Sequence, residues 1–268
     1  MKRIAGIDLS NVKAVYDGPE GDLWELIMGE QIHIGGFVSS LDLAEKAAIA
    51  EGFTGVDLCC CNGAGMRFLV RFRQVAKMTG VDATSTVIER GRQRCQAEGL
   101  EGKISFTQAD VCASGLDAGM CDFVWGEDAW CYVVDKEKLI AEAARLVKPG
   151  GTIAFTDWIE GEAPLSDTEA ERYLKFMKFP NVQDLNGYKN LLTQNGCEVE
   201  IAEDTGRFAP YVDLYLNMLS MQLTYDALKI IGFDSDLMQS LAGEMQFMQT
   251  LAHEGKIAQG LFVAKKKG

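Results

Sequence analysis

The sequence of 268 residues has no run of about 20 consecutive apolar residues, the length that a transmembrane helix needs. It contains only 5 prolines against 28 glycines, so glycine marks most of the expected turns. It is also poor in positive charge, since 26 Lys and Arg residues stand against 39 Asp and Glu residues. The resulting net charge of −13 repels phosphate groups, so we expect neither nucleic acid nor a membrane as a partner.

The sequence also lacks the signs of a secreted protein. Its eight cysteines follow no regular spacing, and a chain of this length buries enough surface to fold without disulfides. The first residues, Met1 to Asp8, mix charged and apolar types, unlike a secretory signal peptide. We therefore expect a reduced, cytoplasmic protein. Hydrophobic residues at 47% and charged residues at 24% are typical of a globular fold.

Short β-rich segments alternate with helix-length segments through the middle of the chain. The predicted strands are residues 55–60, 77–82, 103–108, 121–125 and 151–156, and the predicted helices between them are 65–77, 85–98 and 135–147. Two further strands are expected late in the chain, at 197–202 and 257–265. This pattern is typical of an α/β fold, in which helices cover both faces of a mostly parallel sheet.

The remaining segments are helical and lie outside this alternation. We predict an N-terminal helical cap over residues 1–50 and a main domain over residues 51–268. Helical lid insertions at about 160–186 and 209–253 precede the last two strands. The second insertion is rich in methionine, which is compatible with a helical core or with an apolar pocket: Met218, Met221, Met238, Met245 and Met248.

Acidic residues follow three of the predicted strands. Asp57 opens the segment DLCCCNGAG at residues 57–65, a strand-to-helix turn rich in small residues that let a ligand approach the backbone. Asp82 follows 25 residues later, near the spacing at which an acid binds ribose hydroxyls in nucleotide folds. Asp110 follows after a further 28 residues. Each acid could instead cap a helix or a turn, but three at regular spacing favour a nucleotide-like ligand.

Together with WGEDA at residues 125–129 and LVKPGG at 146–151, these segments resemble the class I S-adenosylmethionine-dependent methyltransferases. The resemblance covers residues 50–157, and the LVKPGG turn is its most specific part. It implies a Rossmann-like, mostly parallel sheet of seven strands and S-adenosylmethionine as the cofactor. A dehydrogenase is less compatible, because that family lacks this turn.

The resemblance also implies roles for individual residues. Around the methionine end of the cofactor it places Asp57, Cys59, Gly63 and Glu127, and around the adenosine it places Asp82 on the ribose, Ala83 against the adenine, and Asp110 and Val111 at the adenine edge. Tyr16 and the Ile32–His33 segment would close over the cofactor from the N-terminal side.

A narrower resemblance links the chain to the sarcosine and dimethylglycine N-methyltransferases and to the phosphoethanolamine N-methyltransferases. It rests on residues 29–35, 67–69, 127–129, 155–157 and 255–256. It implies a small-molecule methyl acceptor, most simply an amine, attacked in line with the departing sulfonium. It leaves a homodimer open.

The chain departs from the family pattern at two places. Cysteines occupy positions 59 and 61, where the family has glycines, so any positive φ there becomes costly. These cysteines are expected to act as small hydrophobic residues, and no metal site is predicted. Tyr132 occupies the position at which the phosphoethanolamine enzymes have a histidine, so their Tyr–His pair is not intact here.

Residues near the fourth strand and in the lid are candidates for the acceptor site. Asp128, Tyr132 and Tyr16 are the candidate catalytic residues, although Asp128 could instead cap a turn and His33 could be a packing residue. Aromatic faces stabilise a cationic methyl group, which makes Trp130, Trp158 and Tyr211 candidates for substrate contacts. Packing alone is the alternative for these rings, and it is favoured for Tyr211 and its neighbour Tyr215.

Two other functions stay open at this point. The methionine-rich lid and the missing histidine are compatible with carbon, oxygen or sulfur methylation of an apolar molecule. The altered glycine turn is compatible with a protein that binds S-adenosylmethionine without transferring its methyl group.

Overall fold

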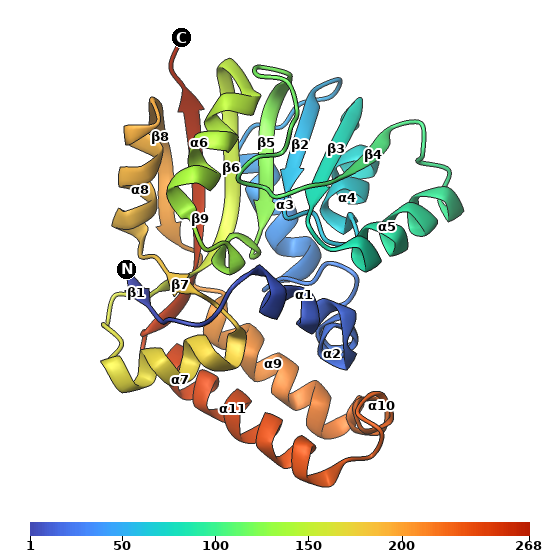
Figure 1. The fold of residues 1–268 in the computed structure, drawn as a ribbon, viewed down its shortest axis with the longest axis vertical. Coiled ribbons are helices and arrows are strands. Elements are labelled where there is room, and N and C mark those ends of the chain that lie inside the picture. The colour runs from blue at the N-terminus through green and yellow to red at the C-terminus, as the bar shows by residue number, and fades with distance from the viewer.

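The computed structural model describes all 268 residues, and its centre is a seven-stranded sheet with the order β4-β3-β2-β5-β6-β9-β8. Neighbouring strands are parallel from β4 to β6, whereas β9 runs antiparallel to both β6 and β8 (Figure 1). The strands are β2 (Thr54–Leu58), β3 (Lys77–Asp82), β4 (Ile104–Gln108), β5 (Cys121–Glu127), β6 (Val147–Glu160), β8 (Cys197–Asp204) and β9 (Ile257–Lys266). The predicted Rossmann-like α/β fold is confirmed.

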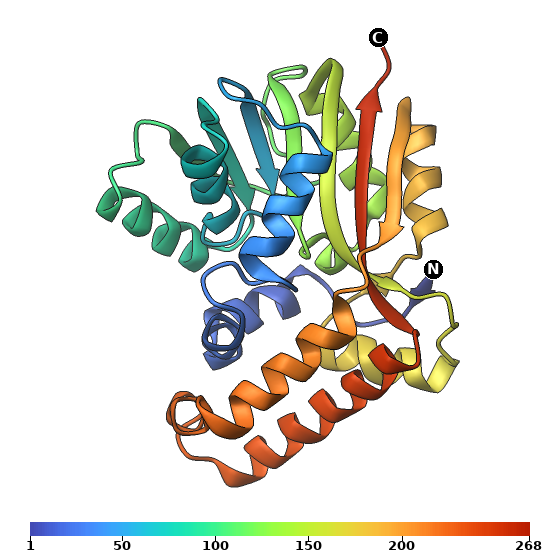
Figure 2. The same ribbon diagram turned by 180° about the vertical axis from the view of Figure 1, so that it is seen from behind.

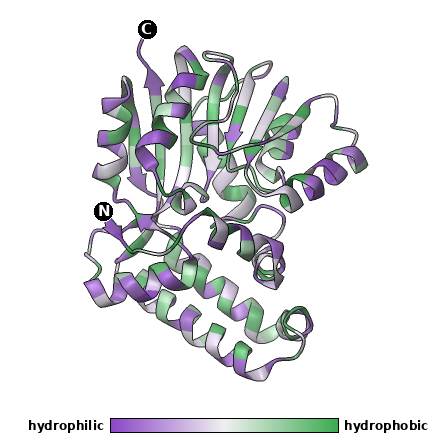
Figure 3. Cartoon of the chain, in the orientation of Figure 1, coloured by the Kyte–Doolittle hydropathy of each residue, from purple (hydrophilic) through white to green (hydrophobic).

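Helices cover both faces of this sheet, as the alternation predicted (Figures 1 and 2). One face carries α6 (Lys136–Leu146) and α8 (Leu185–Gln194), and the other carries α3 (Gly36–Lys46) and α4 (Ala64–Phe72), with α5 (Ser85–Ala97) beside β4. Successive residues of β6 face opposite cores, since Ile153 and Phe155 pack with α6 whereas Ala154 packs with α4. Hydrophobic residues accordingly concentrate in the central strands (Figure 3).

The remaining helices gather at the edge of the sheet where the parallel strands end (Figure 1). They are α1 (Leu9–Asp17), α2 (Pro19–Met28), α7 (Asp167–Met177), α9 (Phe208–Met221), α10 (Thr224–Ile230) and α11 (Ser235–His253), together with the short strands β1 (Lys2–Arg3) and β7 (Asn181–Val182). We call this group the cap. It has a core of its own, which includes Trp158, Phe179 and Tyr215. None of the helices is long and apolar enough to cross a bilayer.

The predicted N-terminal helical segment begins with two separate helices, α1 and α2. Gly18 has an extended backbone that ends α1 and begins α2, and Pro19 occupies the first turn of α2. Ion pairs of Glu25 with Arg90 and Arg94 attach α2 to α5 of the main domain. The third helix of the predicted N-terminal helical segment, α3, begins at Gly36 and packs on α4 and β6 of the main domain.

Candidate active site

The turn after β2 is a tight, left-handed segment. Cys59 has φ +66° and Cys61 has φ +47°, so both cysteines adopt the conformation that the glycines of the family pattern favour. The Cys59 amide donates to the Val81 carbonyl at 2.9 Å, and the Cys61 amide donates to the Asp82 carboxylate at 3.0 Å. The end of β3 therefore holds the turn in place despite its backbone strain.

Cys59→Gly and Cys61→Gly are each expected to raise the free energy of unfolding by up to about 1 kcal/mol, because glycine adopts a positive φ without strain. Urea denaturation measures this change. The matched controls are Cys59→Ala and Cys61→Ala, which remove the same thiols but keep the strained Cβ. Glycine variants less stable than their alanine partners would show that the turn is not strained.

A cavity of about 200 Å³ opens beside this turn, at the carboxyl ends of β2, β3 and β4. It is lined by all four residues that the family resemblance assigned to adenosine, by Cys59 of the turn and by both candidate catalytic tyrosines: Asp82, Ala83, Asp110, Val111, Cys59, Tyr16 and Tyr132. Parallel strands bring these side chains together because their carboxyl ends meet at one edge. Cys61, Cys112 and Lys138 also line the cavity and were not assigned from the sequence as cofactor contacts.

Asp82 is the most constrained acid of this cavity. One carboxylate oxygen accepts the Thr84 amide at 2.9 Å and the other accepts the Cys61 amide at 3.0 Å. Burial raises the pKa of this carboxyl group, while these hydrogen bonds favour its ionised form. Each carboxylate oxygen has a second lone pair, so Asp82 can hold the turn and still accept hydrogen bonds from a ligand.

Two further acids, Asp57 and Glu127, lie next to this cavity, and neither forms an ion pair with a Lys or Arg side chain. Asp57 is 4% exposed, and burial together with Glu127 and Asp82 raises its pKa well above the usual range. The Glu127 carboxylate accepts the Ser40 hydroxyl at 2.5 Å and lies 3.3 Å from the His33 ring. Two buried carboxyl groups without a Lys or Arg partner are suited to a cationic ligand.

Glycine is required where α4 passes these acids. A Cβ atom on Gly65 would lie 2.4 Å from a Glu127 carboxylate oxygen, and one on Gly63 would lie 2.7 Å from the Phe106 ring. Gly63 also has φ +74°. The spacing of the glycines therefore follows from the close approach of this helix to the ends of the strands, as well as from the turn itself.

Asp128 does not line the cavity and instead joins three distant segments. Its carboxylate accepts the Ile34 amide at 2.8 Å and the Gln259 side-chain amide at 2.8 Å. Its own amide donates to the Thr156 carbonyl at 2.9 Å. Burial raises the pKa of Asp128, and its partners hold it in one place, which fits a positioning residue better than a base. Ile32 and His33 belong to the loop that this carboxylate fastens, and neither lines the cavity.

Gln259 of β9 is the residue that the sequence analysis missed. It is fully buried, and its side-chain amide donates to the Ile34 carbonyl at 3.0 Å as well as to Asp128, while its oxygen accepts the Thr205 hydroxyl at 3.0 Å. A polar residue in the otherwise apolar stretch 257–264 was the available signal.

Tyr16 and Tyr132 meet at the cavity with ring centroids 5.8 Å apart and ring planes at 77°. Burial raises the pKa of both phenols, so both stay protonated near neutral pH. Tyr132 ends the short 3-10 helix η1 (Trp130–Tyr132). The Cys131 amide of this helix donates to the Asp157 carboxylate at 2.9 Å, which fixes the position of η1. The pair can orient a ligand and exclude water, but neutral phenols are poor bases.

The other aromatic candidates lie away from this cavity. Trp130 is fully buried, donates its indole N–H to the Leu58 carbonyl at 3.0 Å and stacks on Phe155. Trp158 packs edge-on against Phe208. Tyr211 lies on α9, with its ring centroid 6.0 Å from that of Tyr215. The structure therefore places all three aromatic rings in packing positions. Trp130 lies in the core of the sheet, whereas Trp158 and Tyr211 pack at the core of the cap.

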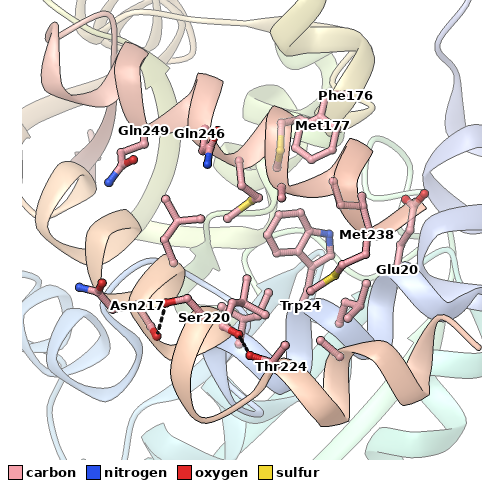
Figure 4. Close-up of a pocket in the computed structure, with 18 of the residues that line it drawn as sticks. Glu20, Trp24, Phe176, Met177, Asn217, Ser220, Thr224, Met238, Gln246 and Gln249 are labelled. Atoms are coloured by element: carbon pink, nitrogen blue, oxygen red, sulfur yellow. Dashed lines mark hydrogen bonds between the residues drawn. The ribbon is translucent and has the colours of Figure 1, made fainter. Parts of the chain in front are cut away.

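A second cavity, of about 510 Å³, lies within the cap (Figure 4). The methionines of the lid divide between several environments. Met238 and Met245 line this cavity, Met248 is buried in the cap core, Met218 packs against that core and Met221 is 79% exposed. Both alternatives raised for the methionine-rich segment therefore apply, each to different residues.

The comparison with protein families decides the class of the main domain. Residues 56–155 match the methyltransferase domain family. The chain therefore contains an S-adenosylmethionine-dependent methyltransferase domain. The matched segment runs from β2 to β6 and contains the turn, Asp82, Asp110 and Glu127. The residues of the site fit that cofactor, since acids without a Lys or Arg partner suit its positive charges and the cavity at the ends of β3 and β4 suits its nucleoside.

Relatives of this methyltransferase act on different acceptors. It is 25% identical over 201 residues to 27-O-demethylrifamycin SV methyltransferase of Amycolatopsis mediterranei, covering 70% of this chain and 74% of that protein. It is 30% identical over 159 residues to dimethylglycine N-methyltransferase of Parasynechococcus marenigrum, covering 53% of this chain and 56% of that protein. The methyltransferase thus spans little more than half of the second relative.

Its fold is shared by a putative sarcosine dimethylglycine methyltransferase from Galdieria sulphuraria. The two structures superpose with a TM-score of 0.80 at 19% identity, covering 93% of this chain and 98% of the other. The similarity includes the cap as well as the sheet. At this level of identity it establishes the shared fold, and the acceptor has to be argued from the site itself.

Proposed function

We propose that this methyltransferase transfers the methyl group of S-adenosylmethionine to an uncharged small molecule, with the adenosine in the cavity beside Asp82. The observation that carries the proposal is the meeting of Asp82, Asp110 and the Tyr16–Tyr132 pair around one cavity, next to Asp57 and Glu127, which have no Lys or Arg partner. In this arrangement Asp82 binds the ribose, Asp110 binds the adenine, and Asp57 and Glu127 face the methionine end.

The cofactor supplies an already activated methyl group, so the chain mainly has to align the acceptor and keep water out. The Tyr16 and Tyr132 rings are suited to this task because they are partly buried in the cavity wall and their faces attract a cationic methyl group. Asp128 and Gln259 act at a distance by holding the 29–35 loop against the end of β5 and the start of β9.

The ion pairs of the two arginines in the lid region favour an uncharged acceptor over an amino acid, because neither arginine is free to bind a carboxylate. Arg172 pairs with Glu244 at 3.0 Å, and Arg207 pairs with Asp42 at 2.5 Å, so both arginines of the lid region are already engaged. An amine of the sarcosine or dimethylglycine type is the second candidate, supported by the dimethylglycine N-methyltransferase relative. A homodimer and the exclusion of nucleic acid stay predictions.

The test of this proposal is calorimetric titration with S-adenosylmethionine, followed by an acceptor screen. Binding at micromolar concentration and methylation of at least one uncharged acceptor would support it. Methylation of sarcosine or dimethylglycine alone would favour the second candidate. Absence of cofactor binding would contradict both.

The affinity for S-adenosylmethionine is expected to fall as the pH is lowered from 7 to 5. The pKa of Asp57 is raised in the free protein, and a cationic ligand favours its ionised form, so binding releases a proton at low pH. Calorimetry in buffers of different ionisation enthalpy measures that release. Asp57→Asn should bind more weakly and with less proton release, whereas equal release from both proteins would exclude Asp57 as the source.

A further inference from the structure

The 510 Å³ cavity of the cap has no assigned ligand and lies apart from the cofactor cavity. It is enclosed by α1 and α2 on one side and by α7, α9, α10 and α11 on the other (Figures 1 and 4). Its volume is within the range of small-molecule sites, about 300–1,000 Å³. The close-up shows Trp24, Met177 and Met238 directed into the same space.

The side chains around this cavity define the chemistry of its ligand. Of the 19 lining residues 13 are hydrophobic, and the one ionisable residue is the exposed Glu20. No Lys, Arg or His lines it, so a carboxylate or phosphate would be buried there without a positive partner. The cavity therefore favours an uncharged, largely apolar molecule.

A small number of amides can orient such a molecule. The hydroxyls of Ser220 and Thr224 donate to backbone carbonyls of their own helical segment, and the Gln249 amide donates to Asp213 at 2.6 Å. Asn217 and Gln246 are exposed residues of the lining, and their side-chain amides make no hydrogen bond within the chain, so both are free to bind a ligand at the edge of the cavity. A ligand with an apolar body and one or two polar atoms would match this lining.

Helix α1 is the wall that the two cavities share. Val15 lines the cap cavity, whereas Val12 and Tyr16 on the same helix line the cofactor cavity. Two consecutive residues of α1, Val15 and Tyr16, thus border the cap cavity and the cofactor cavity respectively. We propose that the cap cavity binds the apolar, uncharged body of the methyl acceptor. This inference rests on the proposed function and specifies its substrate class.

The test uses Leu241→Asp, which places a carboxylate in the cavity wall, and Ser240→Asp, which places the same charge on the next residue outside it. The probe is N-phenyl-1-naphthylamine, a neutral fluorophore that brightens in apolar surroundings. Leu241→Asp is expected to weaken probe binding by about tenfold or more, because the new charge must be desolvated. Ser240→Asp should bind the probe as the unmodified protein does.

A second variant separates loss of the cavity from loss of folding. Ala242→Phe adds volume at the cavity wall without adding charge, and it should also weaken probe binding. Both cavity variants should bind S-adenosylmethionine with unchanged affinity in calorimetry, since neither Leu241 nor Ala242 lines the cofactor cavity. Unchanged cofactor binding with weakened probe binding supports the inference.

Enzyme assays then link the cavity to the acceptor. With an uncharged hydroxyl, amine or thiol compound that the enzyme methylates, Leu241→Asp should raise KM by about tenfold or more, while Ser240→Asp should not. Probe binding that survives in Leu241→Asp, or methylation confined to charged amines, would overturn the inference. If the unmodified protein does not bind S-adenosylmethionine at all, the proposed function fails. Failure of the cap-cavity inference and failure of the proposed function are therefore distinguishable.

Discussion

Asp82→Ala is expected to weaken the binding of S-adenosylmethionine by about one to two orders of magnitude. A hydrogen bond to a charged group contributes about 1.5–3 kcal/mol, and the substitution removes the carboxylate proposed to bind the ribose hydroxyls. It also removes the acceptor that holds the Cys61 amide, so the strained turn after β2 loses one of its supports. Calorimetric titration with the cofactor and with S-adenosylhomocysteine measures the change.

Two further variants make the result specific. Asp82→Asn keeps the size of the side chain and one acceptor oxygen, so its affinity should lie between those of Asp82→Ala and the unmodified protein. Asp117→Ala removes a carboxylate from an exposed loop residue and should leave the affinity unchanged. An Asp82→Ala protein that binds the cofactor within about threefold of normal would show that the ribose is held elsewhere.

Gln259→Leu is expected to lower the free energy of unfolding by about 2–4 kcal/mol, because it leaves several buried groups without their partners. The Asp128 carboxylate loses the hydrogen bond from Gln259 at 2.8 Å and keeps the one from the Ile34 amide. The Ile34 carbonyl and the Thr205 hydroxyl also lose their bonds to Gln259. The volume of the side chain is nearly preserved, so the cost comes from polarity rather than from a void. Urea denaturation gives the change in stability.

The same substitution should also affect the cofactor, because Gln259 and Asp128 together hold the loop that carries His33. We expect weaker binding of S-adenosylmethionine at temperatures where the variant is still folded. Gln239→Leu, at an exposed position of α11, makes the same chemical change without breaking a buried contact. Similar stabilities for Gln259→Leu and Gln239→Leu would contradict the role assigned to this residue.

The acids that line the cavity beside Asp82 could be predicted from the sequence because they lie at the ends of strands. Asp82 and Asp110 each follow a short apolar segment, and parallel strands bring such residues to one edge of the sheet. The positive φ of Cys59 and Cys61 was foreseeable for a similar reason. A turn that leads directly from a strand into a helix imposes its backbone conformation on whichever residues occupy it.

The residues that the sequence placed less well depend on contacts between distant segments. Trp130 follows a strand end, as the cavity residues do, yet the direction of η1 buries it against Phe155. Gln259 is 131 residues from Asp128 along the chain, and no local pattern connects them. They meet only because β6 pairs with β5 on one side and with β9 on the other, which brings the start of β9 near the end of β5.

The sequence alone therefore determined the α/β architecture, the class of enzyme and the acids around the cofactor, since strand alternation and short motifs are properties of neighbouring residues. The tertiary structure alone decided which aromatic rings pack in the core, which buried polar residue joins the 29–35 loop to the sheet, and where an apolar cavity opens. Met238 and Met248 illustrate the difference, because both lie on α11 and are similar in sequence context. Only the way in which α11 meets α2, α7 and α9 makes one of them line a cavity and the other fill the core.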